Sequence, residues 1–195
     1  MMLRTSLTDT DKMRELSLHI LDIVQNSISA NAKNISIEID EQAETDMLSI
    51  TITDDGKGMS EDFLSEVISP FATTRTTRKV GLGIPLFKEA AEETGGKFTI
   101  ESKLGEGTSV KAVFGYSHID RQPLGDIASV MFILVQGNPQ LDFYYKHNVG
   151  TNEFIFDTKQ IRSVLGTEVG LDRPEILSWI SECLQDGIQE LYGGK

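Results

Sequence analysis

The chain has one cysteine, Cys183, so it cannot form an internal disulfide, and we expect that residue to be a small packing side chain. No apolar run approaches the ~20 residues of a membrane span, and the first residues lack the apolar centre of an export signal. Lysine and arginine number 18 against 30 acids, which gives a net charge of −12. These absences disfavour a secreted disulfide scaffold, a membrane protein and a nucleic-acid binder, and predict a cytoplasmic protein.

A basic island interrupts this acidic composition. The segment 73–79, TTRTTRK, holds Arg75, Arg78 and Lys79 and no acid. In an acidic protein such an island can receive an anionic ligand, although the same composition also suits a solvated loop. Both interpretations stay open at this point.

A helical period begins at Glu15. Apolar residues recur at steps of three and four, and Asp22 and Asn26, four residues apart, point to the opposite side. One side of this helix is therefore expected in a core, while the other offers an acid and an amide. The apolar side consists of Leu16, Ile20, Ile23, Val24 and Ser27.

Alternating and amphipathic segments follow as far as residue 116. The segment 69–83 has no sustained period and is predicted as a loop. Ser60 is a good helix cap. Strands are predicted at 34–40, 47–55, 97–102 and 108–114, and helices at 60–68 and 84–96.

The pattern restarts after Pro123 and Gly125. The apolar segment 127–136 favours a strand, and Trp179 is expected as an anchor in a core. Further strands are predicted at 141–148 and 152–158, and helices at 158–166 and 173–192. We therefore divide the 195 residues into a flexible N-terminus (1–14), a main domain (15–116) and a small α+β extension (117–195) that packs on it or pairs two subunits as a homodimer.

Four polar features occur in a fixed order in the main domain. An amide can hold Mg²⁺, an aspartate can accept an adenine amine, and free N–H groups at a helix start suit phosphate. Glycines permit close backbone approach, and the basic island can neutralise phosphates. The features are Asp22 with Asn26, Asp54 with Gly56 and Gly58, Gly81 with Gly83, and Gly105 and Gly107 with Thr108.

Five motifs resemble those of the GHKL superfamily, named for gyrase, the Hsp90 chaperone, histidine kinases and mismatch-repair ATPases. HILDIVQNSISANA is similar to the N box, DDGKG to the G1 box and ISPFATT to the F box of histidine kinases. KVGLGI resembles the G2 box and GEGT the closing Gly-x-Gly-Thr. The resemblance covers roughly residues 15–115, with all five motifs in order.

This resemblance implies a Bergerat fold, an α+β two-layer sandwich with a mixed sheet on one side and helices on the other. ATP would lie between the helices and a lid at 72–80, with Asn26 at Mg²⁺ and Asp54 at adenine. Gly81 and Gly83 match the lid-end glycines at the phosphates, and Thr108 matches the threonine near the base.

Three places in the sequence depart from the family pattern. Gyrase-type members carry a catalytic glutamate where this chain has Asp22, which could act as a general base or be too weak a base for turnover. Ser29 replaces the basic residue of the kinases, so charge neutralisation must come from the lid or Lys33. Ile84-Pro85 stands where the kinases often have Leu-Ala, and proline is tolerated in a first helical turn.

The histidines do not define a phosphoacceptor or a metal centre. His19 lies on the N-box helix without the helical hairpin that presents a phosphoaccepting histidine, and we expect it to pack or to support the site. His118 and His147 lack the neighbours of a metal ligand.

The sequence thus predicts a bacterial Mg-ATP-binding protein of the histidine kinase-like type, similar to short stand-alone ATPase-like bacterial proteins. It would hydrolyse ATP or phosphorylate a protein partner, as serine kinases of the anti-sigma type do on this fold without a phosphohistidine domain. The alternative is a nucleotide-switched binding module with little turnover. A DNA-repair clamp is disfavoured by the net charge and the kinase-like lid.

Overall fold

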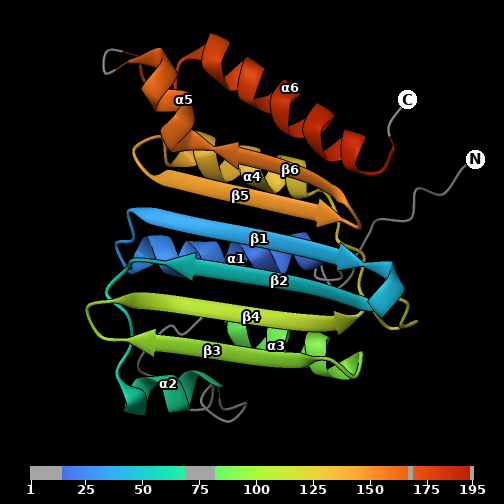
Figure 1. Cartoon of the computed structure of the whole chain (residues 1–195). Helices are drawn as coiled ribbons and strands as arrows, with labels where there is room; N and C mark the ends of the chain where they lie inside the picture. The colour runs from blue at the N-terminus through green and yellow to red at the C-terminus, as the bar shows by residue number, and fades with distance from the viewer. Residues whose placement is uncertain (1–14, 69–81, 167–168, 194–195) are drawn as a thin grey trace, which may run out of the picture.

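The computed structural model describes residues 15–68, 82–166 and 169–193. Within these residues, six strands form one mixed sheet in the order β3-β4-β2-β1-β5-β6, with helices packed against it (Figure 1). The predicted α+β two-layer sandwich is therefore confirmed. The N-terminal segment 1–14, predicted to be flexible, and most of the loop predicted at 69–83, including the predicted lid, lie outside the described residues.

The strands are β1 (Asn34–Gln42), β2 (Met47–Asp54), β3 (Lys97–Lys103), β4 (Gly107–Gly115), β5 (Asp142–Val149) and β6 (Asn152–Asp157). The helices are α1 (Leu16–Ser29), α2 (Glu61–Ile68), α3 (Gly83–Glu93), α4 (Ile127–Gly137), α5 (Thr158–Leu165) and α6 (Pro174–Leu191), with a 3-10 turn, η1 (Ala43–Thr45), between β1 and β2.

Strand pairing fixes which polar residues meet at the ends of the sheet. β2 is antiparallel to both β1 and β4, and β5 is parallel to β1. Asp54, the last residue of β2, faces Thr108 on β4 and follows the pair that Thr53 makes with Ser109. Asp54 and Thr108, which lie far apart in the sequence, are thereby brought together where β2 ends and β4 begins.

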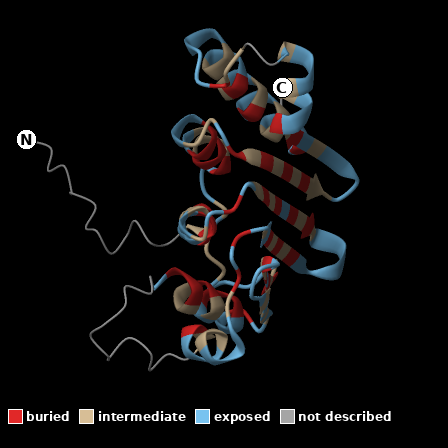
Figure 2. Ribbon diagram, turned by 90° about the vertical axis from the view of Figure 1, so that its left-hand side faces the viewer, coloured by how far each residue is buried: buried red, intermediate tan, exposed pale blue. Residues whose placement is uncertain are grey.

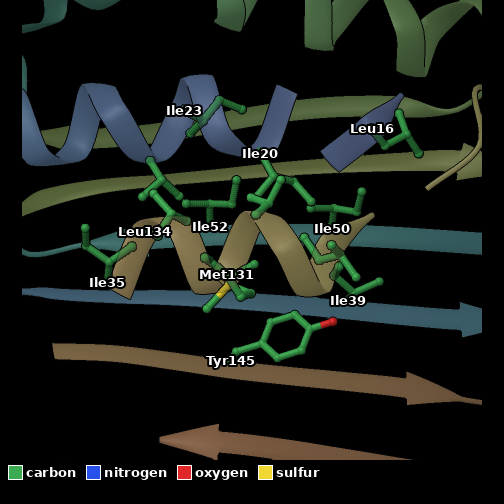
Figure 3. Packing of buried hydrophobic residues seen from close by; sticks show 14 of the residues in the cluster. Leu16, Ile20, Ile23, Ile35, Ile39, Ile50, Ile52, Met131, Leu134 and Tyr145 are labelled. Carbon is green, nitrogen blue, oxygen red and sulfur yellow. The ribbon is translucent and has the colours of Figure 1, made fainter. Parts of the chain in front are cut away.

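The core lies between the sheet and a layer formed by α3, α1 and α4. Figure 2 shows this arrangement from the side, with buried residues concentrated where helices and strands meet. The apolar side predicted for the first helix is buried along its whole length. In Figure 3, side chains of α1 and α4 meet those of β1 and β2; the labelled residues include Ile20, Ile23, Met131, Leu134, Ile35, Ile39, Ile50 and Ile52.

The strand predicted at 127–136 is wrong, because this segment forms α4. Asp126 caps the helix: its Oδ1 accepts the Ser129 N–H at 2.9 Å, and its Oδ2 accepts the Ser129 hydroxyl at 2.6 Å. The buried residues recur at helical spacing, a period that is hidden because almost every position is apolar. They are Ile127, Val130, Met131, Leu134 and Val135.

The segment after residue 116 joins the same sheet and the same core. β5 pairs with β1 along its length, and α4 packs beside α1. The linker also serves the start of α1: the carbonyls of Pro123 and Leu124 accept the N–H groups of Leu16 and Ser17 at 2.9 and 2.8 Å. The boundary at 116/117 and the pairing of subunits stay predictions.

Trp179 does not anchor a core, since it is 49% exposed on α6. The buried stripe of α6 contains Ile180 and Leu184, and Trp179 lies at the margin of this stripe. None of the helices in the described part of the chain combines the length and the apolarity that crossing a bilayer requires.

Candidate nucleotide site

A cleft of about 650 Å³ opens between α1, the end of β2 and the first turn of α3. Asn26, Asp54, Gly58 and Thr108 all line it, so four of the predicted nucleotide-binding residues share one cleft. The volume falls within the range of about 300–1,000 Å³ that is usual for small-molecule sites. The other lining residues are Ile23, Ser27, Ser29, Ala30, Lys57, Met59, Ser60, Phe63, Val67, Ile84, Leu104 and Val110.

Asp54 is held from two sides. Its Oδ2 accepts the hydroxyl of Ser27 on α1 at 2.6 Å, and its Oδ1 accepts the backbone N–H of Gly56 at 2.9 Å. An ionised carboxylate offers about four acceptor positions, so these two bonds leave further acceptor capacity. A ligand at Asp54 must therefore supply a donor, as an exocyclic amine does.

Gly56 and Gly58 let the chain after β2 pass close to its neighbours. A Cβ on Gly56 would lie 2.9 Å from the Cβ of Ala30, at the end of α1. Gly58 has a φ of +63°, and a Cβ there would lie 2.0 Å from the carbonyl oxygen of Lys103. The loop thus packs against α1 on one side and the β3–β4 turn on the other. Gly58 lines the cleft, whereas Gly56 acts through its hydrogen bond to Asp54.

Thr108 belongs to a small hydroxyl network at the start of β4. Its Oγ1 lies 2.8 Å from the Oγ of Ser102 on β3, and that oxygen also accepts the Met59 N–H at 2.9 Å. The network ties the β3–β4 hairpin to the loop that carries Gly58. Thr108 consequently has a fixed position beside Asp54, opposite it in the β2–β4 ladder.

Asp22 lies at the contact between α1 and α3. A Cβ on Gly83 would be 2.8 Å from the Cβ of Asp22, so the glycine allows the two helices to approach closely. Within the described residues, no side-chain hydrogen bond caps the start of α3, and the first N–H groups of a helix have no partner within the helix itself. Asp22 is not among the described residues lining the cleft; it lies beside the helix start that borders the cleft at Ile84.

The remaining predicted site residues divide into two sets. Asn26 is exposed on α1 and lines the cleft, and Gly105 and Gly107 form the β3–β4 turn with φ of +83° and +115°. Arg75, Arg78, Lys79 and Gly81 lie outside the described residues, so their roles stay predictions.

Sequence reasoning missed Ser27 as a site residue, because it assigned this position to the apolar side of the helix. Ser27 is indeed buried, at 3% exposure. A hydroxyl inside an apolar face needs a hydrogen-bond partner, and that requirement was the available signal. The partner is Asp54, and no pattern in the sequence pairs this residue with position 27.

His19 is packed inside the protein. It lies on α1 and is buried against α3, where its ring stacks on Phe87 with centroids 5.7 Å apart. Burial lowers the pKa of His19 against the opposing hydrogen bond to Gln122 and the charge of Asp22. This surrounding agrees with a packing role. Among the described residues, no group of three or more His, Cys, Asp or Glu is placed to hold a metal ion.

His147 belongs to a buried polar cluster that sequence reasoning did not anticipate. Its Nε2 lies 2.9 Å from the Glu41 Oε1, and its Nδ1 lies 2.8 Å from the Tyr145 hydroxyl. The hydroxyl of Tyr192, at the end of α6, donates to the same Glu41 oxygen. The cluster joins the ends of β1 and β5 to α6, away from the cleft.

The fold and the cleft define a class of protein: a two-layer α+β domain that gathers an acid, an amide and glycine-rich turns around a nucleotide-sized cleft. A family model described as histidine kinase-, DNA gyrase B- and HSP90-like ATPase matches residues 11–117. The chain belongs to this family, and the GHKL resemblance drawn from the motifs is confirmed.

Curated relatives match the same part of the chain. The sensor histidine kinase ZraS of Salmonella typhimurium is 30% identical over 100 residues, covering 51% of this chain and 21% of that protein. The histidine protein kinase DivJ of Caulobacter vibrioides is 29% identical over 106 residues, covering 52% and 18%. The chain therefore spans about a fifth of the length of these relatives.

A solved structure extends the likeness in fold beyond the family match. The N-terminal domain of a DNA repair protein superposes with a TM-score of 0.51 at 17% identity, covering 80% of this chain and 58% of that chain. At this identity the likeness concerns the fold alone.

Proposed function

We propose that this ATPase-family chain binds ATP together with Mg²⁺ in the cleft between α1, β2 and α3. One observation carries the proposal: Asn26, Asp54 and Thr108 come from three separate elements and line a single cleft. A shared cleft supports joint action on one ligand, because each residue alone has an ordinary structural explanation.

The base end of the cleft suits adenine. Asp54 already accepts hydrogen bonds from Ser27 and Gly56 and has acceptor positions left over. The exocyclic amine of adenine would donate to it, whereas the carbonyl oxygen of guanine would face another acceptor. Met59, Phe63 and Val110 supply apolar walls for a flat ring.

The phosphate end lies toward α3. Asn26 would hold Mg²⁺ through its amide oxygen, with phosphates and water completing the shell, because Mg²⁺ prefers oxygen ligands and keeps several waters. When bound, the metal neutralises phosphate charge. The first turn of α3 would donate N–H groups to the phosphates. Gly81, Arg75, Arg78 and Lys79 belong to the same proposal on sequence grounds.

Asp22 is the candidate general base. It would take the proton of the nucleophile, either water or a protein hydroxyl, as the γ-phosphoryl group leaves ADP. Its place beside Gly83, at the start of α3, puts a carboxylate near the proposed phosphate end. The kinase names of the relatives make a protein hydroxyl or another protein side chain a reasonable acceptor, and with it a protein partner.

The proposal is tested with ATP labelled at the γ-phosphate, incubated with the protein alone and with cell extract. Label on a protein identifies a kinase, and free phosphate identifies an ATPase. Asn26→Ala should abolish the magnesium-dependent part of nucleotide affinity in a calorimetric titration. An unchanged affinity in this variant, with Mg²⁺ present, would remove Asn26 from the site.

A second function is favoured by the side chain at position 22. Aspartate is one methylene shorter than glutamate, and Asp22 is not among the described residues that line the cleft. A poor base would leave a nucleotide-switched binding module in which ATP occupancy controls contact with a protein partner. ATP binding without either labelled product would select this function.

A further inference from the structure

Asp55 follows the adenine-facing Asp54 but is directed elsewhere. The cleft lining includes Asp54 and Lys57 among the described residues and does not include Asp55. Instead Asp55 borders the polar face of the sheet, at the ends of β1 and β2. Its role must therefore be sought in what its carboxylate holds.

The carboxylate of Asp55 accepts three hydrogen bonds from the start of β1. Its Oδ1 accepts the backbone N–H groups of Lys33 at 2.7 Å and Asn34 at 2.9 Å. Its Oδ2 accepts the side-chain amide of Asn34 at 2.5 Å. The backbone N–H of Asp55 also donates to the Asn34 carbonyl at 3.3 Å. Four bonds thus close the β1–β2 ladder just beyond its last pair, Ile35 with Asp54.

The residues held in this way continue directly into the site. The turn between α1 and β1 runs from Ala30 to Lys33, and within it Asn31 adopts a left-handed φ of +62°. The N–H groups of Ala30 and Ala32 donate to the carbonyls of Asn26 and Ser27. The turn is therefore bonded to Asn26 and Ser27, two of the α1 residues that line the cleft.

The same turn also supports the loop after β2. The carbonyl of Ala30 accepts the Lys57 N–H at 2.9 Å, and the Ala30 side chain lies against Gly56. Asp55 consequently anchors the turn at β2, and the turn anchors both the cleft end of α1 and the glycine loop. Movement at Asp55 would change the separation between α1 and Asp54.

The hydrogen bonds around Asp55 favour the ionised form of its carboxylate. Partial burial acts to raise the pKa of Asp55, but hydrogen bonds from Asn34 and Lys33 outweigh it and hold the pKa below its ordinary value. Hydrogen bonds to an ionised acceptor are roughly twice as strong as neutral ones.

We infer that Asp55 is a positioning residue for nucleotide selection: it contacts no part of the nucleotide, but fixes the spacing of Ser27 and Asp54 that makes the cleft prefer adenine over guanine. This inference rests on the proposed function. Loss of the Asp55 hydrogen bonds to Lys33 and Asn34 lets α1 shift relative to β2. The Ser27–Asp54 bond then no longer sets the direction of the Asp54 acceptors.

The experiment compares Mg-ATP and Mg-GTP affinities of wild type, Asp55→Ala and Asp55→Asn by calorimetric titration. Asp55→Ala should weaken ATP binding about tenfold and GTP binding much less, so that the ATP preference falls by at least about fivefold. Asp55→Asn keeps one oxygen for the two backbone donors and should fall between wild type and Asp55→Ala.

Asp46→Ala is the matched control. Asp46 precedes the other end of β2, and its carboxylate accepts the Ser117 N–H at 2.7 Å. Its loss should reduce stability without changing the ratio of ATP to GTP affinity. A role of Asp55 in general stability alone would give the two aspartates the same unchanged ratio.

Each outcome decides one of the two claims. Wild type that binds no nucleotide rejects the proposed function. Wild type that prefers ATP, with Asp55→Ala folded and equally selective, overturns the inference about Asp55. Should Asp55→Ala fail to fold, Asp55→Asn decides the question. A loss of ATP preference in Asp55→Asn supports the positioning role of Asp55, and full retention of the preference overturns it.

Discussion

The hydroxyl of Ser27 donates to the Asp54 Oδ2 at 2.6 Å, joining α1, the middle helix of the helical layer, to the end of the central strand β2. This bond orients the carboxylate that faces the cleft and leaves its remaining acceptors for a ligand. A buried serine on an otherwise apolar helix face thereby becomes part of the candidate site.

Replacing Ser27 with alanine should weaken Mg-ATP binding by about three- to tenfold, or about 0.7–1.4 kcal/mol, because the Asp54 carboxylate loses the hydrogen bond that orients its remaining acceptors. Stability should fall by about 1–3 kcal/mol because the buried bond to Asp54 is lost, and the higher helix propensity of alanine recovers less than about 0.7 kcal/mol of this. Calorimetric titration measures the affinity. Gln25→Ala, at an exposed position of the same helix, is the control, and equal affinities in the two variants would contradict the role of Ser27.

Replacing Asp22 with alanine should abolish turnover and spare nucleotide binding. General-base catalysis contributes about 10²–10⁴ in rate, so any phosphate release should fall by that order. A phosphate-release assay beside a binding titration separates the two effects. Undiminished release would show that Asp22 is not the base.

Replacing Gly83 with alanine should destabilise the protein by about 1–3 kcal/mol, the usual range for overpacking. The new Cβ would lie 2.8 Å from the Cβ of Asp22, which can only be relieved by separating α1 from α3. Gly137→Ala is the matched control in α4, because a Cβ there meets nothing within 4 Å. Chemical denaturation of both variants checks this, and equal midpoints would contradict the close helix contact.

The cluster around Glu41 predicts a loss of stability in acid. Burial acts to raise the pKa of Glu41. Hydrogen bonds from His147 and Tyr192, together with electrostatic interactions with His147 and Arg121, outweigh burial and lower the pKa below the ordinary 4.5. Because the folded pKa is the lower one, the stabilisation is complete above pH 4.5 and disappears as the pH falls through the folded value.

Urea denaturation of wild type and Glu41→Gln measures this contribution. The difference in stability between them should be largest near neutral pH and should shrink below about pH 4.5. A difference independent of pH would mean that the ionised carboxylate is not what His147 and Tyr192 stabilise. Nucleotide affinity at neutral pH should be equal in the two proteins, since the cluster lies at the far end of β1.

Strands β1 and β2 were predictable because isoleucines alternate with polar residues in both, as at Ile35, Ile37 and Ile39 in β1. A period of two is that of a strand with one buried face. α4 was not, because an all-apolar segment contains no visible period. The addition of β5 beside β1 was equally hidden, since a parallel pairing over 100 residues of sequence leaves no local trace.

The site divides in a similar way. Asn26, Asp54 and the glycines could be selected from motifs, because residue type and order are preserved in the sequence. Ser27 and Asp55 could not, because their roles depend on which strand end lies next to which helix turn. In the sequence Asp55 is only part of a predicted turn. Its role follows from the three hydrogen bonds that its carboxylate accepts from Lys33 and Asn34.

The central claim is that this cleft binds adenine nucleotides through Asp54. Its most direct test is a calorimetric titration of wild type and Asp54→Ala with Mg-ATP. We expect saturable binding to one site in wild type and a loss of at least about tenfold in affinity for the folded variant. No binding by wild type, or the same affinity in folded Asp54→Ala, would contradict it.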